Sequence, residues 1–251
     1  MNVLVACESS GTVREAFRAL GHNAWSCDLL PADDGSPYHF KQDALRAICG
    51  GFPVADISVE PLWDAFVTGG IAPNGDNIDC INQDGDWDCY PTDSVLPAVE
   101  WDLIIAHPPC TYLSSSGLHW NKRIKDRQAK TDQAHDFFME MVAHCEEVGA
   151  KYAIENPIGC MSRLWRKPDQ IVQPWMFGHD ASKATCLWIH GLPLLEPTQY
   201  VEPRMVGGKK RWANQTDSGQ NRLPPSKHRW KIRSKTYEGI AKAMAHQWGG
   251  A

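Results

Sequence analysis

The sequence predicts an α/β fold in which a mostly parallel sheet is covered by helices on both faces. Three short apolar runs, at residues 2–6, 101–106 and 151–154, are typical of buried parallel strands. A helical spacing of apolar residues follows the first run over 13–20, and a longer amphipathic pattern spans 132–148. Because strands that alternate with helices are joined by right-handed crossovers, these segments are expected to share one sheet.

Further elements extend this prediction toward the carboxyl terminus. Strands are expected at residues 23–27 and 184–189, and a closing helix at 237–248. Residues 203–230 show no regular pattern and are expected to be irregular. A chain of 251 residues can bury a substantial core, so we expect residues 1–251 to form a single domain.

The charged residues are distributed unevenly around a net charge of −5. Residues 51–100 hold ten Asp or Glu and no Lys or Arg, and glycines and prolines interrupt them, which predicts an acidic, loop-rich insertion with one short helix near 59–67. Residues 203–235 reverse this balance, with ten Lys or Arg against only Asp217. A polyanionic partner is therefore expected near the second segment.

Several classes of protein are disfavoured by composition. No apolar run approaches the length of a membrane span, and the first residues lack the features of a signal peptide. The nine cysteines show no zinc spacing, and although Cys80 and Cys89 flank aspartates that resemble part of a calcium loop, the remaining ligands are missing. We expect a soluble, intracellular protein with reduced thiols and no metal.

Polar residues follow several of the predicted strands, at the edge of the sheet where α/β proteins bind ligands. They are found at residues 8–11, at Asp28, at 107–110 and at 155–157, and one crevice could hold them all. The turn at 8–11 has a single glycine, so it is not a dinucleotide fingerprint. With Asp28 it could still approach a cofactor ribose, the alternative being a tight turn followed by an exposed aspartate.

Cys110 follows His107, Pro108 and Pro109 directly after a predicted strand. The two prolines stiffen the turn and hold the thiol where the sheet opens, which favours a nucleophile over a structural cysteine. Its thiolate could attack an electron-poor ring carbon if nearby donors or a cation lowered its pKa. Glu155 ends the next strand and could protonate a substrate if burial raised its pKa, although Glu-Asn-Pro is also a common structural turn.

Taken together, these motifs resemble the DNA (cytosine-5) methyltransferase family over about two thirds of the chain. Residues 109–117 are similar to the family's Pro-Cys-Gln-x-Phe-Ser-x-x-Gly loop, and residues 155–157 look like its Glu-Asn-Val. Phe177 and Gly178, with Lys183 and Thr185, resemble its Tyr-Gly-x-x-Gln-x-Arg-x-Arg strand. The resemblance implies a Rossmann-like methyltransferase sheet and S-adenosyl-L-methionine as cofactor.

The resemblance also implies roles for individual residues. The catalytic residues would be Cys110, Glu155 and Lys183. The cofactor-binding residues would be Cys7, Glu8, Ser9, Gly11, Asp28, Asp43, His107 and Pro108. The substrate-binding residues would be Ser114, Asn156, Thr185, Arg229 and Arg233.

The chain departs from the family at three places. Lys183, Thr185 and Ala181 replace the family's two arginines and glutamine, and residues 6–11 replace its aromatic, glycine-rich cofactor turn. A short basic segment, residues 190–235, stands where the family has a long target-recognition domain. Its tryptophans and cations suit base stacking and phosphate contact, a solvated loop being the alternative, and the loop after the nucleophile adds further cations at Lys122, Arg123, Lys125, Arg127 and Lys130.

The resemblance implies methylation of cytosine carbon 5 in DNA, with the target base flipped out of a double-stranded substrate. We expect a monomer in the cytoplasm of a bacterium or phage-infected host, in the setting of phage biology or restriction-modification. One alternative is the same chemistry on a free pyrimidine nucleotide, and another is a catalytically degenerate DNA-binding protein. Amino-group methylation is disfavoured, because an amine acceptor needs no thiol nucleophile such as Cys110.

Overall fold

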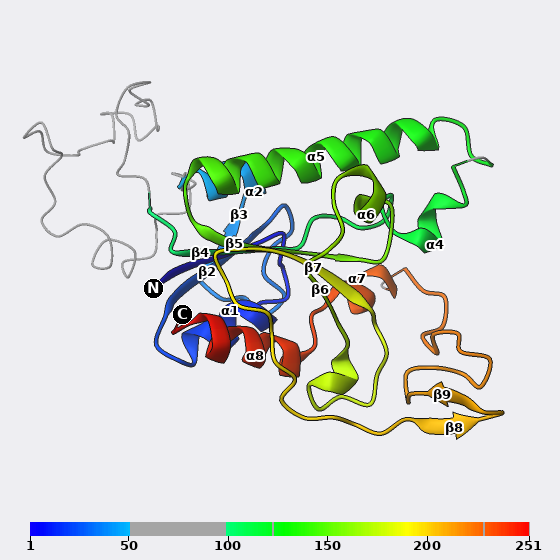
Figure 1. Cartoon of the computed structure of the whole chain (residues 1–251). Coiled ribbons are helices and arrows are strands. Elements are labelled where there is room, and N and C mark those ends of the chain that lie inside the picture. The colour runs from blue at the N-terminus through cyan, green and yellow to red at the C-terminus, as the bar shows by residue number, and fades with distance from the viewer. Residues whose placement is uncertain (51–98, 122, 228, 251) are drawn as a thin grey trace, which may run out of the picture.

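The computed structural model describes residues 1–50, 99–121, 123–227 and 229–250, and these form a sheet with helices on both sides (Figure 1). The seven strands of the sheet are β1 (Asn2–Ala6), β2 (Asn23–Asp28), β3 (His39–Lys41), β4 (Leu103–Ala106), β5 (Lys151–Pro157), β6 (Gln170–Val172) and β7 (Thr185–His190). The helices are α1 (Thr12–Arg18), α2 (Ala44–Ile48), α4 (Ser115–Leu118), α5 (Arg127–Glu147), α6 (Met161–Leu164), the 3-10 helix η2 (Pro174–Met176), α7 (Arg229–Ser234) and α8 (Glu238–Trp248). A separate hairpin pairs β8 (Arg204–Val206) with β9 (Lys209–Arg211).

The predicted mixed α/β fold is confirmed by the order of the strands, β3-β2-β1-β4-β5-β7-β6. The first five are parallel, and β7 runs antiparallel to both of its neighbours. The chain winds outward from β1 in one direction and from β4 in the other. Their shared boundary is the topological switch point at which open α/β sheets bind ligands.

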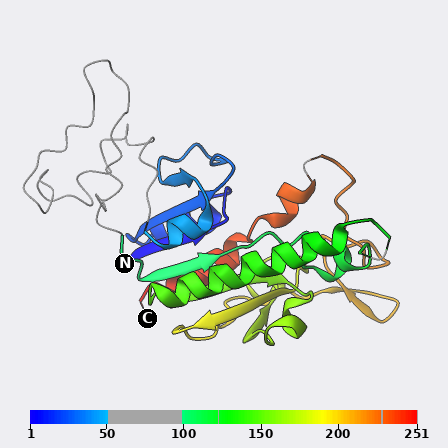
Figure 2. The same cartoon turned by 90° about the horizontal axis from the view of Figure 1, so that it is seen from above.

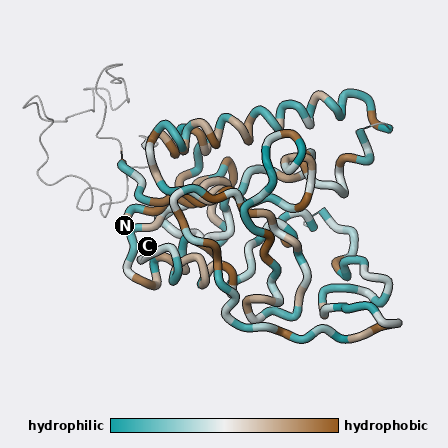
Figure 3. Tube along the Cα trace, viewed as in Figure 1, coloured by the Kyte–Doolittle hydropathy of each residue, from teal (hydrophilic) through white to brown (hydrophobic). Residues whose placement is uncertain are grey.

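Alternate residues of the central strands feed two apolar cores, one on each face. Val3 and Val5 pack with α1 and α8 on one face, whereas Leu4 and Ala6 pack with α2 and α5 on the other. Strands buried on both faces contain few polar residues, which explains the apolar runs in the sequence. The hydrophobic segments accordingly concentrate in the middle layer (Figure 3), and α5 lies lengthwise along the sheet (Figure 2).

Two predictions are corrected by the structure, and one is confirmed with a direction added. The helix expected at 132–148 begins earlier, at Arg127. The strand expected at 184–189 is confirmed as β7, which lies antiparallel between β5 and β6. Strand β3 and helix α2 were not predicted, because three and five residues are too few to show a period. Residues 203–230 were expected to be irregular, but they contain the β8–β9 hairpin, whose turn is made by two glycines with positive φ.

The acidic insertion and its short helix fall almost wholly on residues 51–98, outside the described residues. Among the helices of the described ranges, none has the length and apolar character needed to cross a membrane.

Candidate active site

The register of the sheet brings four of the predicted site residues into one row. Cys27, Ala6, Ala106 and Ile154 are matched across the four neighbouring strands β2, β1, β4 and β5. The residues that follow them are Asp28, Cys7, His107 and Glu155. His107 lies at the switch point, where its backbone N–H donates to the carbonyl oxygen of Ala6 at 2.9 Å. Segments far apart in the sequence therefore present their polar residues at one edge of the sheet.

Two hydrogen bonds join the Pro-Pro-Cys turn to the Glu-Asn-Pro strand end. His107 Nδ1 lies 2.8 Å from Glu155 Oε2, and Asn156 Nδ2 donates to the Pro108 carbonyl at 2.9 Å. Both residues also carry a buried polar atom without a partner in the described part of the chain, namely His107 Nε2 and Asn156 Oδ1. Buried polar atoms are rarely left unpaired, so these two are candidates to meet a ligand.

The loop that follows Cys110 is fastened to the turn after β5. Backbone hydrogen bonds run from Ser115 N–H to the Ile158 carbonyl and from Cys160 N–H to the Leu113 carbonyl. Gly159 lies between them, and a side chain at this position would collide with the Leu113 carbonyl oxygen. The loop and the turn thus form one unit, and the half-buried Cys110 at its start is held close to Glu155.

Glu155 is 8% exposed and carries a lower pKa than an ordinary glutamate. Burial by itself would raise the pKa, but the positive charge of Lys183 and the hydrogen bonds from His107 and Thr185 outweigh it. The condition set out from the sequence, a pKa raised by burial, is therefore wrong for the substrate-free protein. The surroundings of Glu155 therefore favour its carboxylate form.

The Cys110 thiol is the second departure from the expected electrostatics. Burial and the negative charge of Glu155 raise its pKa, and the positive charges of Lys183 and Arg233 only partly oppose them. A lowered pKa was the condition for a reactive thiolate, and it is not met in the substrate-free protein because burial and the Glu155 charge outweigh the two cations. The thiolate would form when a substrate changes this balance or when another group accepts the proton.

Lys183 forms hydrogen bonds with the end of α7, and it makes no ion pair with Glu155 in the described part of the chain. Its Nζ donates to the carbonyl oxygens of Ser234 at 3.4 Å and Lys235 at 3.2 Å, where α7 ends. Its charge nevertheless reaches both Glu155 and Cys110. Glu155, Lys183 and Thr185 line a small cleft whose far side is made by Thr236 and the start of α8.

Just after β1, the Glu8 carboxylate accepts hydrogen bonds from neighbouring groups of the protein. Oε1 accepts from the Val13 N–H at 2.8 Å and from Ser10 Oγ at 3.1 Å, while Oε2 accepts from the Arg14 N–H at 3.3 Å. A carboxylate at a helix N-terminus satisfies otherwise unpaired N–H groups and interacts favourably with the helix dipole. Glu8 therefore shapes the turn before α1, and any effect on a cofactor would act through that shape.

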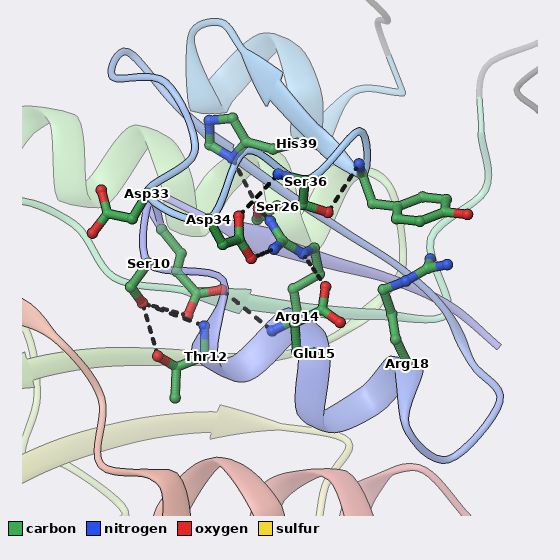
Figure 4. A network of polar contacts seen from close by, with 12 residues as sticks. Ser10, Thr12, Arg14, Glu15, Arg18, Ser26, Asp33, Asp34, Ser36 and His39 are labelled. Carbon is green, nitrogen blue, oxygen red and sulfur yellow. Dashed lines mark hydrogen bonds and ion pairs between the residues drawn. The ribbon is translucent and has the colours of Figure 1, made fainter. Parts of the chain in front are cut away.

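Arg14 is a fully buried cation that the sequence analysis missed (Figure 4). Its guanidinium donates to Ser26 Oγ at 2.8 Å and to Glu15 at 2.8 Å, and it pairs with Asp34. Ser26 in turn contacts His39 Nδ1 at 2.9 Å. This network fixes the loop between β2 and β3 against α1. An arginine at an otherwise apolar position of the first helix was the only available signal.

Gly11 has a backbone conformation that the network requires. Its φ is +68°, and a side chain there would collide with the Arg14 guanidinium and the Asp34 carboxylate. Glycine adopts this left-handed conformation without the cost that other residues incur. The single glycine of the predicted cofactor turn is thus explained by both backbone geometry and space.

Asp28 and Asp43 are the two predicted acidic cofactor residues, and both lie near Cys7, whose pKa burial and nearby negative charges raise. One oxygen of each accepts local backbone N–H groups, from Leu30 for Asp28 and from Leu45 and Arg46 for Asp43. The second oxygen of each has no donor within the described ranges. Ser9, the remaining cofactor candidate, uses its carbonyl to accept from the Asp33 N–H at 2.8 Å.

Of the predicted substrate-binding residues, Ser114 lies on the Cys110 loop, whereas Arg229 and Arg233 lie on α7. Ser114 Oγ lies 3.2 Å from Ser116 Oγ on the Cys110 loop, and Arg233 lies near enough to Cys110 for its charge to act on the thiol. Arg229 begins α7. Among the loop cations, Arg127 packs over the Tyr112 ring, with its guanidinium carbon 4.8 Å from the ring centroid, whereas Lys122 lies outside the described residues.

The described residues contain no group of three or more His, Cys, Asp or Glu side chains that could hold a metal ion. Cys80 and Cys89 lie outside them. The seven described cysteines are free thiols.

The chain was compared with known proteins by sequence and by structure. No protein-family model matches the sequence, and no curated protein sequence matches it. Among solved structures, the chain is similar to a candidate DNA modification methyltransferase encoded within an E. coli prophage, with a TM-score of 0.42 and 13% sequence identity. The match covers 80% of this chain and 52% of that protein, so the chain spans about half of its length. The reaction proposed below therefore rests on the residues of this chain.

Proposed function

We propose that the protein is an S-adenosylmethionine-dependent methyltransferase that acts on carbon 5 of cytosine in DNA through a covalent adduct of Cys110. The observation that carries this proposal is the pairing of the two motifs at the switch point. A thiol on a stiff turn lies beside a buried carboxylate, and the His107 and Asn156 hydrogen bonds hold the two segments together.

Cytosine carbon 5 is a poor nucleophile, and the thiol provides a way to activate it. The Cys110 thiolate would add to carbon 6, which places electron density on carbon 5. As the carbon–sulfur bond forms, the Glu155 carboxylate would accept the proton that the Cys110 thiol loses and share it with ring nitrogen 3. After carbon 5 takes the methyl group, loss of the carbon 5 proton to solvent would let the carbon–sulfur bond break. Nitrogen 3 would then give back its proton through Glu155, which regenerates the Cys110 thiol.

The cofactor would bind on the half of the row formed by β1 and β2. S-adenosylmethionine supplies the methyl group when bound. The free carboxylate oxygens of Asp28 and Asp43 suit a ribose and an adenine, and an acidic residue after the second strand is the usual ribose ligand in related sheets. The unpaired His107 Nε2 lies at the boundary with the substrate half.

Trapping of the covalent adduct tests this function. DNA that contains 5-fluorocytosine should form a stable complex with the protein and cofactor, because fluorine cannot leave as the carbon 5 proton does. The complex should migrate as a cross-linked band under denaturing conditions, and Cys110→Ala should abolish it and lower methyl transfer by more than about 10³-fold. Cys186→Ala, which removes a buried thiol from β7, is the matched control.

Full methyl transfer by Cys110→Ala would overturn the proposal. Transfer of label from the cofactor to free cytidine nucleotides, but not to DNA, would keep the chemistry and reject the substrate. Absence of cofactor binding in calorimetry would instead favour a DNA-binding protein on a methyltransferase scaffold.

A further inference from the structure

Helix α7 (Arg229–Ser234) is held in place by ion pairs with Asp33, in the loop after β2, and by hydrogen bonds from Lys183, just before β7. Lys231 Nζ lies 2.6 Å from Asp33 Oδ1, and Lys235 Nζ lies 3.5 Å from Asp33 Oδ2. At the same end, Lys183 donates to the carbonyl oxygens of Ser234 and Lys235. The loop after β2 therefore fixes one side of α7, and the start of β7 fixes its carboxyl end.

These anchors orient the rest of the helix. Lys231, within α7, and Lys235, directly after its last residue, both contact Asp33. Trp230 and Arg233 are three residues apart within α7, so they share a face of the helix that differs from that of Lys231. Ser234, which follows Arg233, accepts a hydrogen bond from Lys183 Nζ, and Lys183 lines the cleft beside Glu155, so this end of α7 borders the proposed substrate site.

The same face is open to solvent although it carries a large aromatic ring. Trp230 is 57% exposed, and no residue of α7 is buried. Arg233 forms no ion pair with any described residue, whereas Lys231 and Lys235 both pair with Asp33. An exposed tryptophan beside an unpaired arginine is the combination that stacks on a base and binds the adjacent phosphate in proteins that hold unstacked nucleic acid.

We infer that the Trp230–Arg233 face of α7 binds an unpaired nucleotide of the DNA strand that enters the Cys110 site. Trp230 stacks on a base that has left the duplex stack, and Arg233 binds a neighbouring phosphate. The inference rests on the proposed function, since it names the element that holds the DNA at the same site.

Fluorescence anisotropy with labelled DNA, in the absence of cofactor, tests the inference without requiring methyl transfer. The probes are a fully paired duplex and the same duplex with one unpaired cytosine. Trp230→Ala should weaken binding of the second probe about tenfold, equivalent to about 1.4 kcal/mol, and weaken binding of the first less. Trp230→Phe should retain most of the affinity, because phenylalanine can also stack.

Salt dependence separates the two side chains. Arg233→Ala should reduce the slope of log affinity against log salt by about 1, whereas Trp230→Ala should lower the affinity and leave the slope unchanged. Two controls should match the wild type: Tyr200→Ala removes an aromatic residue that is 62% exposed, and Lys242→Ala removes an exposed cation from α8.

Equal affinity of wild type and Trp230→Ala for the unpaired probe would overturn the inference, as would a Trp230→Phe variant as weak as Trp230→Ala. If the wild type binds DNA and forms the 5-fluorocytosine adduct while Trp230→Ala does both equally well, only this inference fails. If the wild type binds neither probe, DNA is not the substrate and the inference falls with that part of the proposed function.

Discussion

Glu8 and Glu155 are two buried carboxylates at the same edge of the sheet, and their surroundings differ in kind. Glu8 is 5% exposed and accepts hydrogen bonds from backbone N–H groups of α1 and from Ser10. Glu155 is 8% exposed and is surrounded by side chains, with His107 and Thr185 as donors and Lys183 as a nearby charge.

The difference separates structural from chemical roles. Around Glu8 and Arg14, the charged groups are paired within the protein, as in a network that specifies a conformation. Around Glu155, His107 Nε2 and Asn156 Oδ1 remain without partners in the described ranges. Groups buried without partners are costly to the fold, so their presence at a strand end indicates a place where a ligand completes the hydrogen bonds.

The largest expected effect is on chemistry, in Glu155→Gln. Loss of a positioned acid–base group should lower the turnover number about 10²- to 10⁴-fold, while cofactor affinity measured by calorimetry changes little. Glu8→Gln is the matched substitution on the other half of the row. It should instead lower the free energy of unfolding by about 1 kcal/mol, because it weakens the cap of α1. Equal losses of turnover and cofactor binding in Glu155→Gln would point to a structural Glu155.

The next effect is on stability, in Arg14→Met. Methionine fills similar space but leaves Asp34 and Ser26 without their cationic donor, so the free energy of unfolding should fall by about 2–3 kcal/mol in urea titrations. Arg46→Met, on the exposed side of α2, should leave the urea midpoint almost unchanged. Identical midpoints for the two variants would show that the buried network contributes nothing net.

A smaller effect is expected from alanine at two glycines with nearly equal backbone angles. Gly35 has φ +66° and open space around it, so Gly35→Ala should cost about 1–2 kcal/mol for the left-handed conformation alone. Gly11 has φ +68°, and a side chain there also meets Arg14 and Asp34. Gly11→Ala should therefore be the less stable of the two in thermal unfolding. Equal melting temperatures would argue against tight packing of the turn.

The smallest effect is a displacement of the pH profile in Lys183→Met. Lys183 lowers the pKa of both Glu155 and Cys110, so its removal should raise both. The alkaline rise in kcat/KM that accompanies thiol ionisation should then move to higher pH. The acid limb should also move upward, because Glu155 would lose its charge at a higher pH than before.

The same pKa directions have consequences for stability. A carboxylate whose folded pKa is depressed stabilises the protein above its unfolded pKa, and this contribution disappears as the pH falls through the folded value. Lys183→Met should therefore reduce the stabilisation by Glu155 at neutral pH, and the remainder should disappear at a higher pH as the solution is acidified. A stability and activity profile that coincides with the wild type at all pH values would contradict the electrostatic role of Lys183.

The local motifs could be predicted from the sequence because each lies next to a strand with a strong apolar pattern. Cys110 follows β4, Glu155 lies within β5 after four residues of an apolar run, and parallel strands necessarily bring such ends to one edge. Arg14 and Asp33 could not be found in the same way. Apart from Glu15, which is adjacent to Arg14, their side-chain partners are 12 to 202 residues away, and no local pattern specifies those contacts.

The sequence by itself determined the α/β class, the apolar central strands and the order of the Cys110 and Glu155 segments, since these depend on short-range periodicity. Only the tertiary structure decided the charge states at the site. The pKa values of Glu155 and Cys110 depend on Lys183. This residue lies just before β7, and its Nζ donates to the Lys235 carbonyl oxygen just after α7. Electrostatic interactions depend on distances between segments remote in the chain, and those distances exist only once the sheet and α7 have been assembled.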